Sequence, residues 1–163
     1  MADKPSVIRE TDNEARELAK SLLREARFAA IGVLDPETGF PAVSRIILTT
    51  SDDGVPFILA STLAAHTQAI LKDPRCSLLV GEPQDKGDPL VHPRMTVPCI
   101  AEKVAKDSDE HGRLRERFLT THPKAKLYID FGDFGFYRLV PQGAALNGGF
   151  GKAFLLTPSD ILN

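Results

Sequence analysis

One arginine, Arg45, lies within a segment rich in apolar and β-branched residues, where Val43, Ile46 and Ile47 flank it. Arginine is seldom fully buried without a partner, so its side chain must face outward, join an ion pair or meet a ligand. A guanidinium held on a rigid strand suits a phosphate, because its planar set of donors matches the phosphate oxygens. Position alone leaves the structural and the ligand-binding interpretations open.

Two polar pairs, Ser61-Thr62 and His66-Thr67, lie where an apolar strand gives way to a predicted helix. The start of a helix offers unpaired N–H groups and the positive end of its dipole, so anions bind there readily. The alternative is ordinary N-capping by Ser61 or Thr62, with His66 facing solvent. Because Arg45 is only one hairpin away in sequence, both features could converge on one anion, and a phosphate site becomes a second open interpretation.

A third polar segment, His92-Pro93-Arg94-Met95-Thr96, opens a predicted strand after a long loop. It is either a polar strand end or a set of donors, Arg94 and Thr96 among them, at the rim of a ligand.

The segment Asn147-Gly148-Gly149-Phe150-Gly151-Lys152 is rich in glycine. It does not match the dinucleotide-binding pattern G-x-G-x-x-G, and it joins two strands instead of opening a helix. It is either a hairpin turn or a loop whose missing Cβ atoms let a flat ligand approach.

No catalytic residue can be named from the remaining polar residues. The nucleophile motif G-x-S-x-G is absent, and the four histidines show no metal-ligand spacing, so we expect no metal site. The two cysteines, Cys76 and Cys99, are distant in sequence, and we expect two free, buried thiols.

Seven strands and three helices are expected to position these residues. Thr11 followed by Glu14 is a capping-box signature that opens the first helix. Strands outnumber helices and tight turns join most of them, which favours a mainly β (α+β) fold, an antiparallel split β-barrel with flanking helices. We expect a flexible arm over residues 1–10 and one domain over residues 11–163. The predicted strands cover residues 28–34, 41–50, 56–60, 75–81, 94–104, 134–146 and 151–156, and the later helices residues 61–72 and 107–122.

The composition is that of an ordinary globular domain, with 42% apolar and 26% charged residues in 163. The net charge is −2 and no block of Lys or Arg occurs, which argues against nucleic acid as a partner. No apolar run approaches the roughly 20 residues of a membrane span, and no secretory leader opens the chain. We therefore expect a cytoplasmic protein.

Taken together, these segments resemble the pyridoxamine 5′-phosphate oxidase-like FMN-binding split barrels. The segments that carry the resemblance are 41–45, 59–67 and 73–79, whereas 88–96 and 148–153 are similar to the haem-utilisation branch. The resemblance implies a homodimer with FMN at the interface. It implies that Arg45 contacts the FMN phosphate, that Ser61, Thr62, His66 and Thr67 complete that pocket, and that Thr96 faces the flavin ring.

The departures from the family bear on activity. Vitamin B6 oxidases of this kind have a lysine where this chain has about Thr50, and a C-terminal substrate segment with tryptophan, which this chain lacks. The main hypothesis is an FMN-dependent oxidoreductase acting on an unknown small molecule. The alternatives are a haem-binding or haem-utilisation protein, and a non-catalytic dimeric module that binds a partner.

Overall fold

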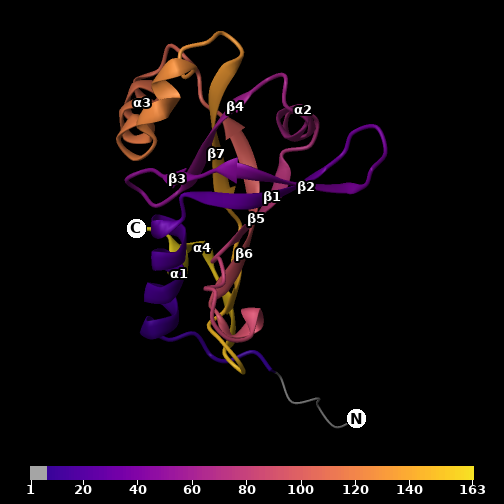
Figure 1. The fold of residues 1–163 in the computed structure, drawn as a ribbon, viewed down its shortest axis with the longest axis vertical. Helices are drawn as coiled ribbons and strands as arrows, with labels where there is room; N and C mark the ends of the chain where they lie inside the picture. Colours follow the sequence, from indigo (N-terminus) through magenta and orange to yellow (C-terminus); the bar gives the residue numbers. More distant parts are fainter. Residues whose placement is uncertain (1–6) are drawn as a thin grey trace.

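The computed structural model of the protein describes residues 7–163, which form one curled antiparallel sheet with helices against it (Figure 1). The strand order is β2-β1-β5-β6-β7-β4-β3, and β8 branches from β6 and carries β9. Every strand pair is antiparallel, so the predicted antiparallel split barrel with flanking helices is confirmed. The strands are β1 (Phe28–Leu34), β2 (Pro41–Ile47), β3 (Thr49–Thr50), β4 (Pro56–Ser61), β5 (Arg75–Val80), β6 (Arg94–Lys103), β7 (Phe134–Pro141), β8 (Ala144–Asn147) and β9 (Ala153–Leu156).

Four α-helices and two short 3₁₀ helices accompany the sheet within the described residues. The β1–β2 hairpin projects to one side of the molecule, α2 lies beside it, and α3 covers the ends of β4 and β7 (Figure 1). The helices are α1 (Asn13–Glu25), α2 (Ala65–Lys72), α3 (Asp109–Thr121) and α4 (Pro158–Ile161), with η1 (Pro89–Val91) and η2 (Pro123–Leu127).

The first helix begins one residue later than its capping signature predicted. Asp12 is the N-cap, and its side chain accepts a hydrogen bond from the Ala15 backbone N–H at 2.8 Å. Thr11 instead donates its hydroxyl to the Leu155 carbonyl, so it joins the helix to β9. A carboxylate caps the helix start at least as well as a hydroxyl, and it also complements the helix dipole.

Two predicted strands are divided in the structure. The segment 41–50 separates into β2 and β3 at Leu48, whose N–H donates to the Arg27 carbonyl and whose side chain is buried. The segment 134–146 separates into β7 and β8 at Gln142 and Gly143. The two parts of each predicted strand therefore have different sets of partner strands in the curled sheet. Strand β2 pairs with β1 and β3 with β4, whereas β7 pairs with β4 and β6, and β8 with β6 and β9.

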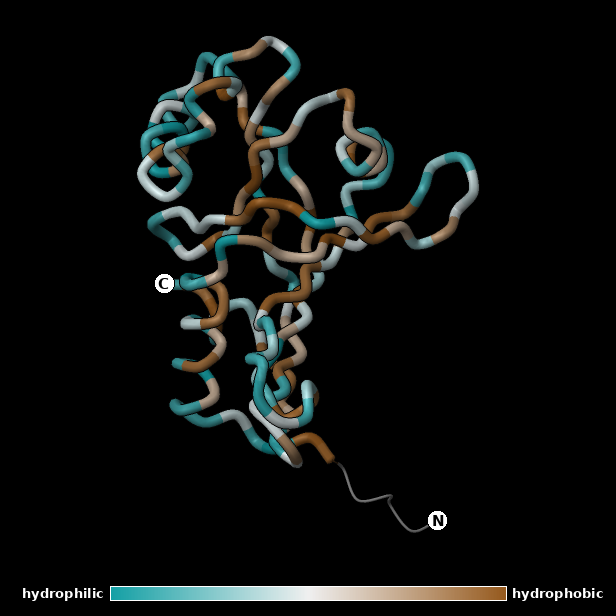
Figure 2. Tube along the Cα trace, viewed as in Figure 1, coloured by the Kyte–Doolittle hydropathy of each residue, from teal (hydrophilic) through white to brown (hydrophobic). Residues whose placement is uncertain are grey.

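The apolar stripe of α1 packs on the sheet, since Ala15, Ala19 and Leu23 are buried in the main core. Figure 2 shows the hydrophilic side of this helix turned to solvent. The other wall of the main core is the inner face of the sheet, from β1 to β7.

A second, smaller core lies under α3. Along β4 and β7 the side chains alternate, so Ile58 and Tyr137 enter the main core while Phe57 and Phe136 point the other way. We call Phe57, Phe118 of α3 and Phe136 the phenylalanine cluster; its ring centroids lie 5.7–6.2 Å apart.

Residues 1–6 of the predicted flexible arm lie outside the described residues. In the described part of that segment, the Arg9 N–H donates to the Ala153 carbonyl at 2.8 Å, and Ile8 forms a parallel bridge with Ala153. The chain therefore meets β9 before α1 begins.

Candidate functional site

Ser61 and Thr62 form a turn that sets the position of α2. Neither residue is the N-cap of this helix, so the capping interpretation is wrong. The N-cap is Ala64, which has no capping side chain. Ser61 Oγ donates to Asp133 Oδ2 at 2.5 Å and accepts the Leu63 N–H, and the Thr62 N–H donates to the Asp133 carbonyl. Asp133 lies 72 residues away in sequence, so no local pattern could have indicated this contact.

His66, in the first turn of α2, lines a cavity of about 470 Å³ between α2 and the β1–β2 hairpin. The imidazole is half-buried, and this burial lowers the pKa of His66 below its ordinary value of 6.5. At neutral pH the ring is therefore uncharged and has a free nitrogen lone pair, the state in which histidine binds a metal. The cavity is lined by Val33, Asp35, Pro36, Glu37, Ala42, Val43, Ser44, Ala65, His66, Gln68 and Ala69.

The other three histidines already have partners in the structure. His92 Nε2 lies 2.6 Å from the Lys86 carbonyl, and His122 Nε2 lies 3.3 Å from the Leu48 carbonyl. The ring of His111 packs edge-on against Phe136 in the second core. His92 lines a second cavity of about 400 Å³ beside α1, but its Nε2 is engaged by the Lys86 carbonyl. The imidazole of His66 lines its cavity without such a partner among the described residues.

Thr67 points into the protein and away from the cavity that His66 lines. Its side chain is fully buried, and its hydroxyl has no hydrogen-bond partner among the described residues. A buried hydroxyl without a partner costs stability, because it loses its hydrogen bonds to water.

Replacing Thr67 with valine is expected to raise the free energy of unfolding by about 1 kcal/mol, because it removes the unpaired hydroxyl and keeps the branched shape. Urea unfolding followed by circular dichroism measures the change. Thr67→Ser is the control, since it keeps the hydroxyl and loses the methyl group, and it should lower stability. A loss of stability in Thr67→Val would show that the hydroxyl is satisfied in the folded protein.

Arg45 and Thr96 lie in one row across the face of the sheet that points away from the main core, which we call the outer face. The register runs from Arg45 through Ala30 and Leu79 to Thr96. Three strand spacings of about 4.8 Å put the two ends roughly 14 Å apart. The guanidinium of Arg45 lies over the Phe28 ring, 5.6 Å from its centroid.

Arg94 lies two residues before Thr96 on β6 and therefore shares the outer face. Its Nη1 donates to the Leu90 carbonyl of η1 at 3.0 Å, so its guanidinium supports the long loop. The structure thus brings Arg45, Arg94 and Thr96 to one face of the sheet.

The structure does not bring Arg45 and His66 together within one chain. Ser44, the residue before Arg45, lines the His66 cavity. Because side chains alternate along a strand, Arg45 points to the opposite face of the hairpin. The two halves of the predicted phosphate site, Arg45 and the segment 61–67, are therefore separated by the β1–β2 hairpin.

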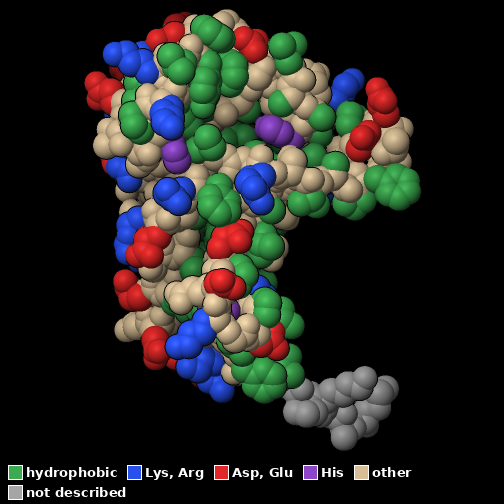
Figure 3. Space-filling model, in the orientation of Figure 1, with side chains coloured by type: hydrophobic (Ala, Val, Ile, Leu, Met, Phe, Trp, Pro, Cys, Tyr) green, Lys and Arg blue, Asp and Glu red, His purple; other side chains and the backbone are tan. Residues whose placement is uncertain are grey.

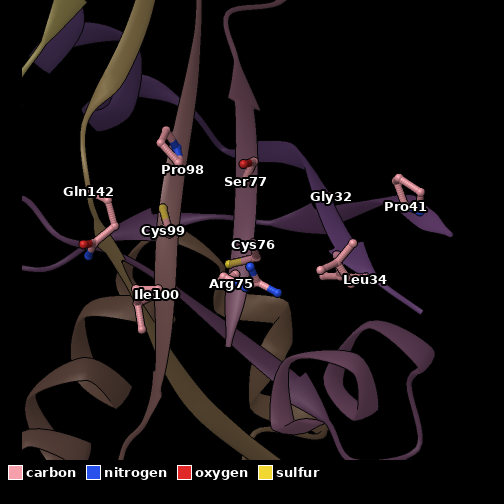
Figure 4. Close-up of a pocket in the computed structure, with 11 residues that line it drawn as sticks. Gly32, Leu34, Pro41, Arg75, Cys76, Ser77, Pro98, Cys99, Ile100 and Gln142 are labelled. Carbon is pink, nitrogen blue, oxygen red and sulfur yellow. The ribbon is translucent and has the colours of Figure 1, made fainter. Parts of the chain in front are cut away.

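The outer face also carries a shallow groove of about 490 Å³ (Figure 4). Gly32, Ser77 and Pro98 form one register row of small side chains across β1, β5 and β6. The cysteines Cys76 and Cys99 lie beside this row, and both are free and buried as expected. The groove is lined by Gly32, Val33, Leu34, Pro41, Arg75, Cys76, Ser77, Pro98, Cys99, Ile100 and Gln142.

Two absences hold for residues 7–163. No helix there has the length and apolar content needed to cross a bilayer. Nor do three or more histidine, cysteine or acidic side chains gather there as a metal-binding group.

The curled antiparallel sheet, its flanking helices and the order of its motifs define a split-barrel domain of the pyridoxamine 5′-phosphate oxidase-like superfamily, in its haem-utilisation branch. The chain belongs to the family described as "CREG, beta-barrel", whose model matches residues 10–162. The predicted superfamily and branch are thereby confirmed.

Three relatives of this chain are named as haem proteins. It is 32% identical over 118 residues to the non-canonical heme oxygenase HOZ, chloroplastic, of Arabidopsis thaliana, a match that covers 72% of this chain and 35% of HOZ. It is 24% identical over 149 residues to the heme oxygenase HutZ of Vibrio cholerae, covering 88% of this chain and 82% of HutZ. A heme binding protein from Mycobacterium smegmatis is 27% identical with a TM-score of 0.81, covering 98% of this chain and 61% of that protein. The chain thus spans about a third of the length of HOZ.

The FMN cofactor expected from the superfamily resemblance is wrong. HOZ, HutZ and the Mycobacterium smegmatis protein, which share sequence with this chain, are named for haem and not for a flavin. The physical reason lies in the site, because the Arg45 guanidinium and the segment 61–67 do not face one phosphate within the chain. A strand arginine and polar residues at a helix start are general features of the superfamily and do not specify the ligand.

Proposed function

We propose that this protein binds haem in the cavity between α2 and the β1–β2 hairpin, with the imidazole of His66 as the iron ligand. The observation that carries the proposal is the 32% identity with HOZ over 72% of this chain. His66 is selected because its imidazole lines this cavity and is not engaged by another group of the described residues.

The residues around His66 suit an amphipathic ring. The cavity volume of about 470 Å³ falls within the range of about 300–1,000 Å³ found for small-molecule sites. Val33, Ala42 and Ala69 supply apolar walls, whereas the acidic residues Asp35 and Glu37 lie in the turn of the hairpin at one end. Because acidic groups repel carboxylates, we infer that the propionates face away from this turn.

Haem bound in this cavity would supply iron for oxygen chemistry or for ligand exchange, and the His66 imidazole would hold it. Ser61 and Thr62 contribute indirectly, because their bonds to Asp133 fix the turn from which α2 begins.

A haemin titration tests the proposal directly. The purified protein should develop a Soret band that saturates at one haem per chain. Reduction of the complex in air then separates two forms of the function: progressive loss of the band identifies haem as a substrate, and a persistent band identifies it as a stored ligand. Weak haemin binding that never saturates would contradict the proposal.

We further propose that two copies of the chain associate through the outer face, where Arg45, Arg94 and Thr96 lie. This face exposes large apolar side chains, with Val43 at 72%, Leu79 at 46% and Leu155 at 63% relative exposure. In Figure 3 hydrophobic side chains border the notch between the projecting hairpin and the lower part of the molecule. Exposed apolar area of this kind is typical of protein interfaces.

Leu79→Arg, at the centre of the outer face, is expected to convert a dimer into monomers. Leu79 pairs with Ala30 and Thr96, so an added charge there would lie unpaired in the interface. Light scattering coupled to size-exclusion chromatography measures the mass. Leu63→Arg is the matched control, because Leu63 is 85% exposed at the β4–α2 turn and should leave the dimer intact. A wild-type monomer at micromolar concentration would refute the dimer.

A further inference from the structure

The two cysteines, 23 positions apart in sequence, are direct cross-strand neighbours in the sheet. Cys76 of β5 is registered opposite Cys99 of β6. Both are free, and both point to the core side of the sheet, with relative exposures of 6% and 2%. Directly opposed residues of an antiparallel pair have Cβ atoms about 4.5–5.5 Å apart.

The hydrogen-bond pattern defines the spacing of this pair. The Ala101 N–H donates to the Pro74 carbonyl at 2.8 Å, so Pro74 and Ala101 occupy a hydrogen-bonded position of the antiparallel ladder. Such positions recur every second residue, and Cys76 and Cys99 therefore occupy the next one. Pro98 lies opposite Ser77 at the neighbouring, non-hydrogen-bonded position. No N–H is donated to β5 from such a position, which agrees with the lack of an N–H in proline. Residues at hydrogen-bonded positions have Cα atoms about 5.5 Å apart, which lies within the range of disulfides. Their Cβ atoms must approach by about 1 Å for the bond to close, because a disulfide joins Cβ atoms about 3.5–4.5 Å apart.

We propose that Cys76 and Cys99 are a modification site, at which hydrogen peroxide converts the two thiols into a cross-strand disulfide. The peroxide is the oxidant, and no other reactant is needed. The Cys76 thiolate attacks one peroxide oxygen and breaks the O–O bond, which leaves a sulfenic acid and hydroxide. The Cys99 sulfur then attacks the Cys76 sulfur and breaks its S–O bond. The two oxygen atoms leave as two water molecules, which take up the two thiol protons and the two hydrogen atoms of the peroxide.

Access and reactivity set the conditions of the reaction. Both cysteines border the outer-face groove (Figure 4), but their side chains are buried on the core side of the sheet. A small oxidant therefore reaches the thiols when this part of the sheet opens locally. Burial raises the pKa of the Cys76 thiol to about 11, and burial together with the neighbouring Cys76 raises the pKa of Cys99 further. Since the thiolate is the nucleophile, oxidation is slow at neutral pH and faster in alkaline buffer.

The disulfide would reduce the conformational freedom of the segment that joins β5 to β6. The segment that it closes contains the exposed loop 82–93 with η1 and His92. A covalent link at the base of a loop limits the conformations that the loop can reach. Oxidation of the pair would therefore restrain this loop.

Peptide mapping tests the proposal on the folded wild-type protein. The protein is treated with hydrogen peroxide at pH 9, its free thiols are alkylated in denaturant, and it is digested with trypsin without reduction. Cleavage after Arg75, Lys86, Arg94 and Lys103 places the cysteines on peptides 76–86 and 95–103. We expect these two peptides to appear as one species that lacks two hydrogen atoms and separates on reduction.

The matched control moves one thiol to the other face of β5 and keeps the number of cysteines. In the double variant Cys76→Ala/Ser77→Cys, the thiol at position 77 points to the outer face, because adjacent strand residues alternate. This variant should give no linked peptides. The proposal fails if folded wild type gives no linked species under conditions that oxidise an exposed thiol, or if the link forms only after unfolding. Equal linkage in the double variant would also overturn it.

Discussion

Replacing His66 with alanine is expected to lower the affinity for haem by at least about 100-fold and to remove the Soret signature of a histidine-ligated iron. Loss of a group that only supports a metal ligand typically costs about 10–100-fold, so loss of the ligand itself should cost at least the upper end. His66 lies on the surface of the cavity and has no hydrogen bond to lose, so the substitution should leave the fold intact. A haemin titration measures the dissociation constant of each variant.

His92→Ala is the matched control for the iron ligand. His92 also lines a cavity, but its Nε2 is bound to the Lys86 carbonyl of the long loop. We expect haem affinity to stay within about threefold of wild type, because no metal ligand is lost. If His92→Ala loses the Soret band while His66→Ala keeps it, the haem site is the cavity beside α1 and not the cavity that His66 lines. If neither variant changes the affinity, iron ligation by either of these histidines is refuted.

The ionisation of His66 adds a pH signature to the same experiment. Burial holds the pKa of His66 below 6.5, so the folded protein binds fewer protons at this site than the unfolded chain does. Stability from the buried neutral ring is therefore fully present above pH 6.5 and is lost as pH falls through the lowered pKa. Haem affinity should follow the same direction, since a proton competes with iron for the ring nitrogen.

The fold could be predicted because local chemistry and global structure agree along most of the chain. The apolar stripe of Ala15, Ala19 and Leu23 specifies one face of α1, and the structure buries that face. The apolar run of residues 56–60 predicts a strand, and the structure forms β4 there. The breaks at Leu48 and Gln142 could not be predicted, because they depend on where the sheet curls.

The site was harder to predict because its contacts are distant in sequence. The bond from Ser61 to Asp133 and the opposition of Cys76 to Cys99 both depend on strand register. The direction of the Arg45 side chain depends on the phase of one strand relative to its neighbours, and a shift of one residue would reverse it. Residue types at the site were therefore recognisable, but their grouping required the three-dimensional structure.

The choice of ligand shows a further limit of the sequence. Arg45 and the segment 61–67 resemble a phosphate site, yet the structure places them on opposite sides of the β1–β2 hairpin. A histidine at position 66 is compatible with contact to a phosphate and with ligation of iron, so the residue type alone does not distinguish these roles. What distinguishes the two roles is its burial, because a half-buried, neutral imidazole suits a metal better than an anion.

Replacing Phe57 with alanine is expected to lower the free energy of unfolding by about 3–5 kcal/mol. Phe57 has no exposed surface, and its ring packs against Phe118 and Phe136 at centroid distances of 6.2 and 5.7 Å. The second core is small, so few neighbouring side chains can move into the cavity that the substitution leaves. Because a domain of this size has a total stability of about 5–15 kcal/mol, the loss is a large fraction of it.

Urea unfolding, followed by circular dichroism at one fixed protein concentration, measures this loss. A fixed concentration is needed because association of two copies would itself shift the midpoint. Phe150→Ala is the matched control: the same side-chain atoms are removed, but Phe150 is 92% exposed at the tip of the β8–β9 hairpin. We expect that variant to stay within about 0.5 kcal/mol of wild type. A Phe57→Ala loss below about 1 kcal/mol would mean that α3 is not held to the sheet by the phenylalanine cluster, since burial of a ring this large contributes more than that.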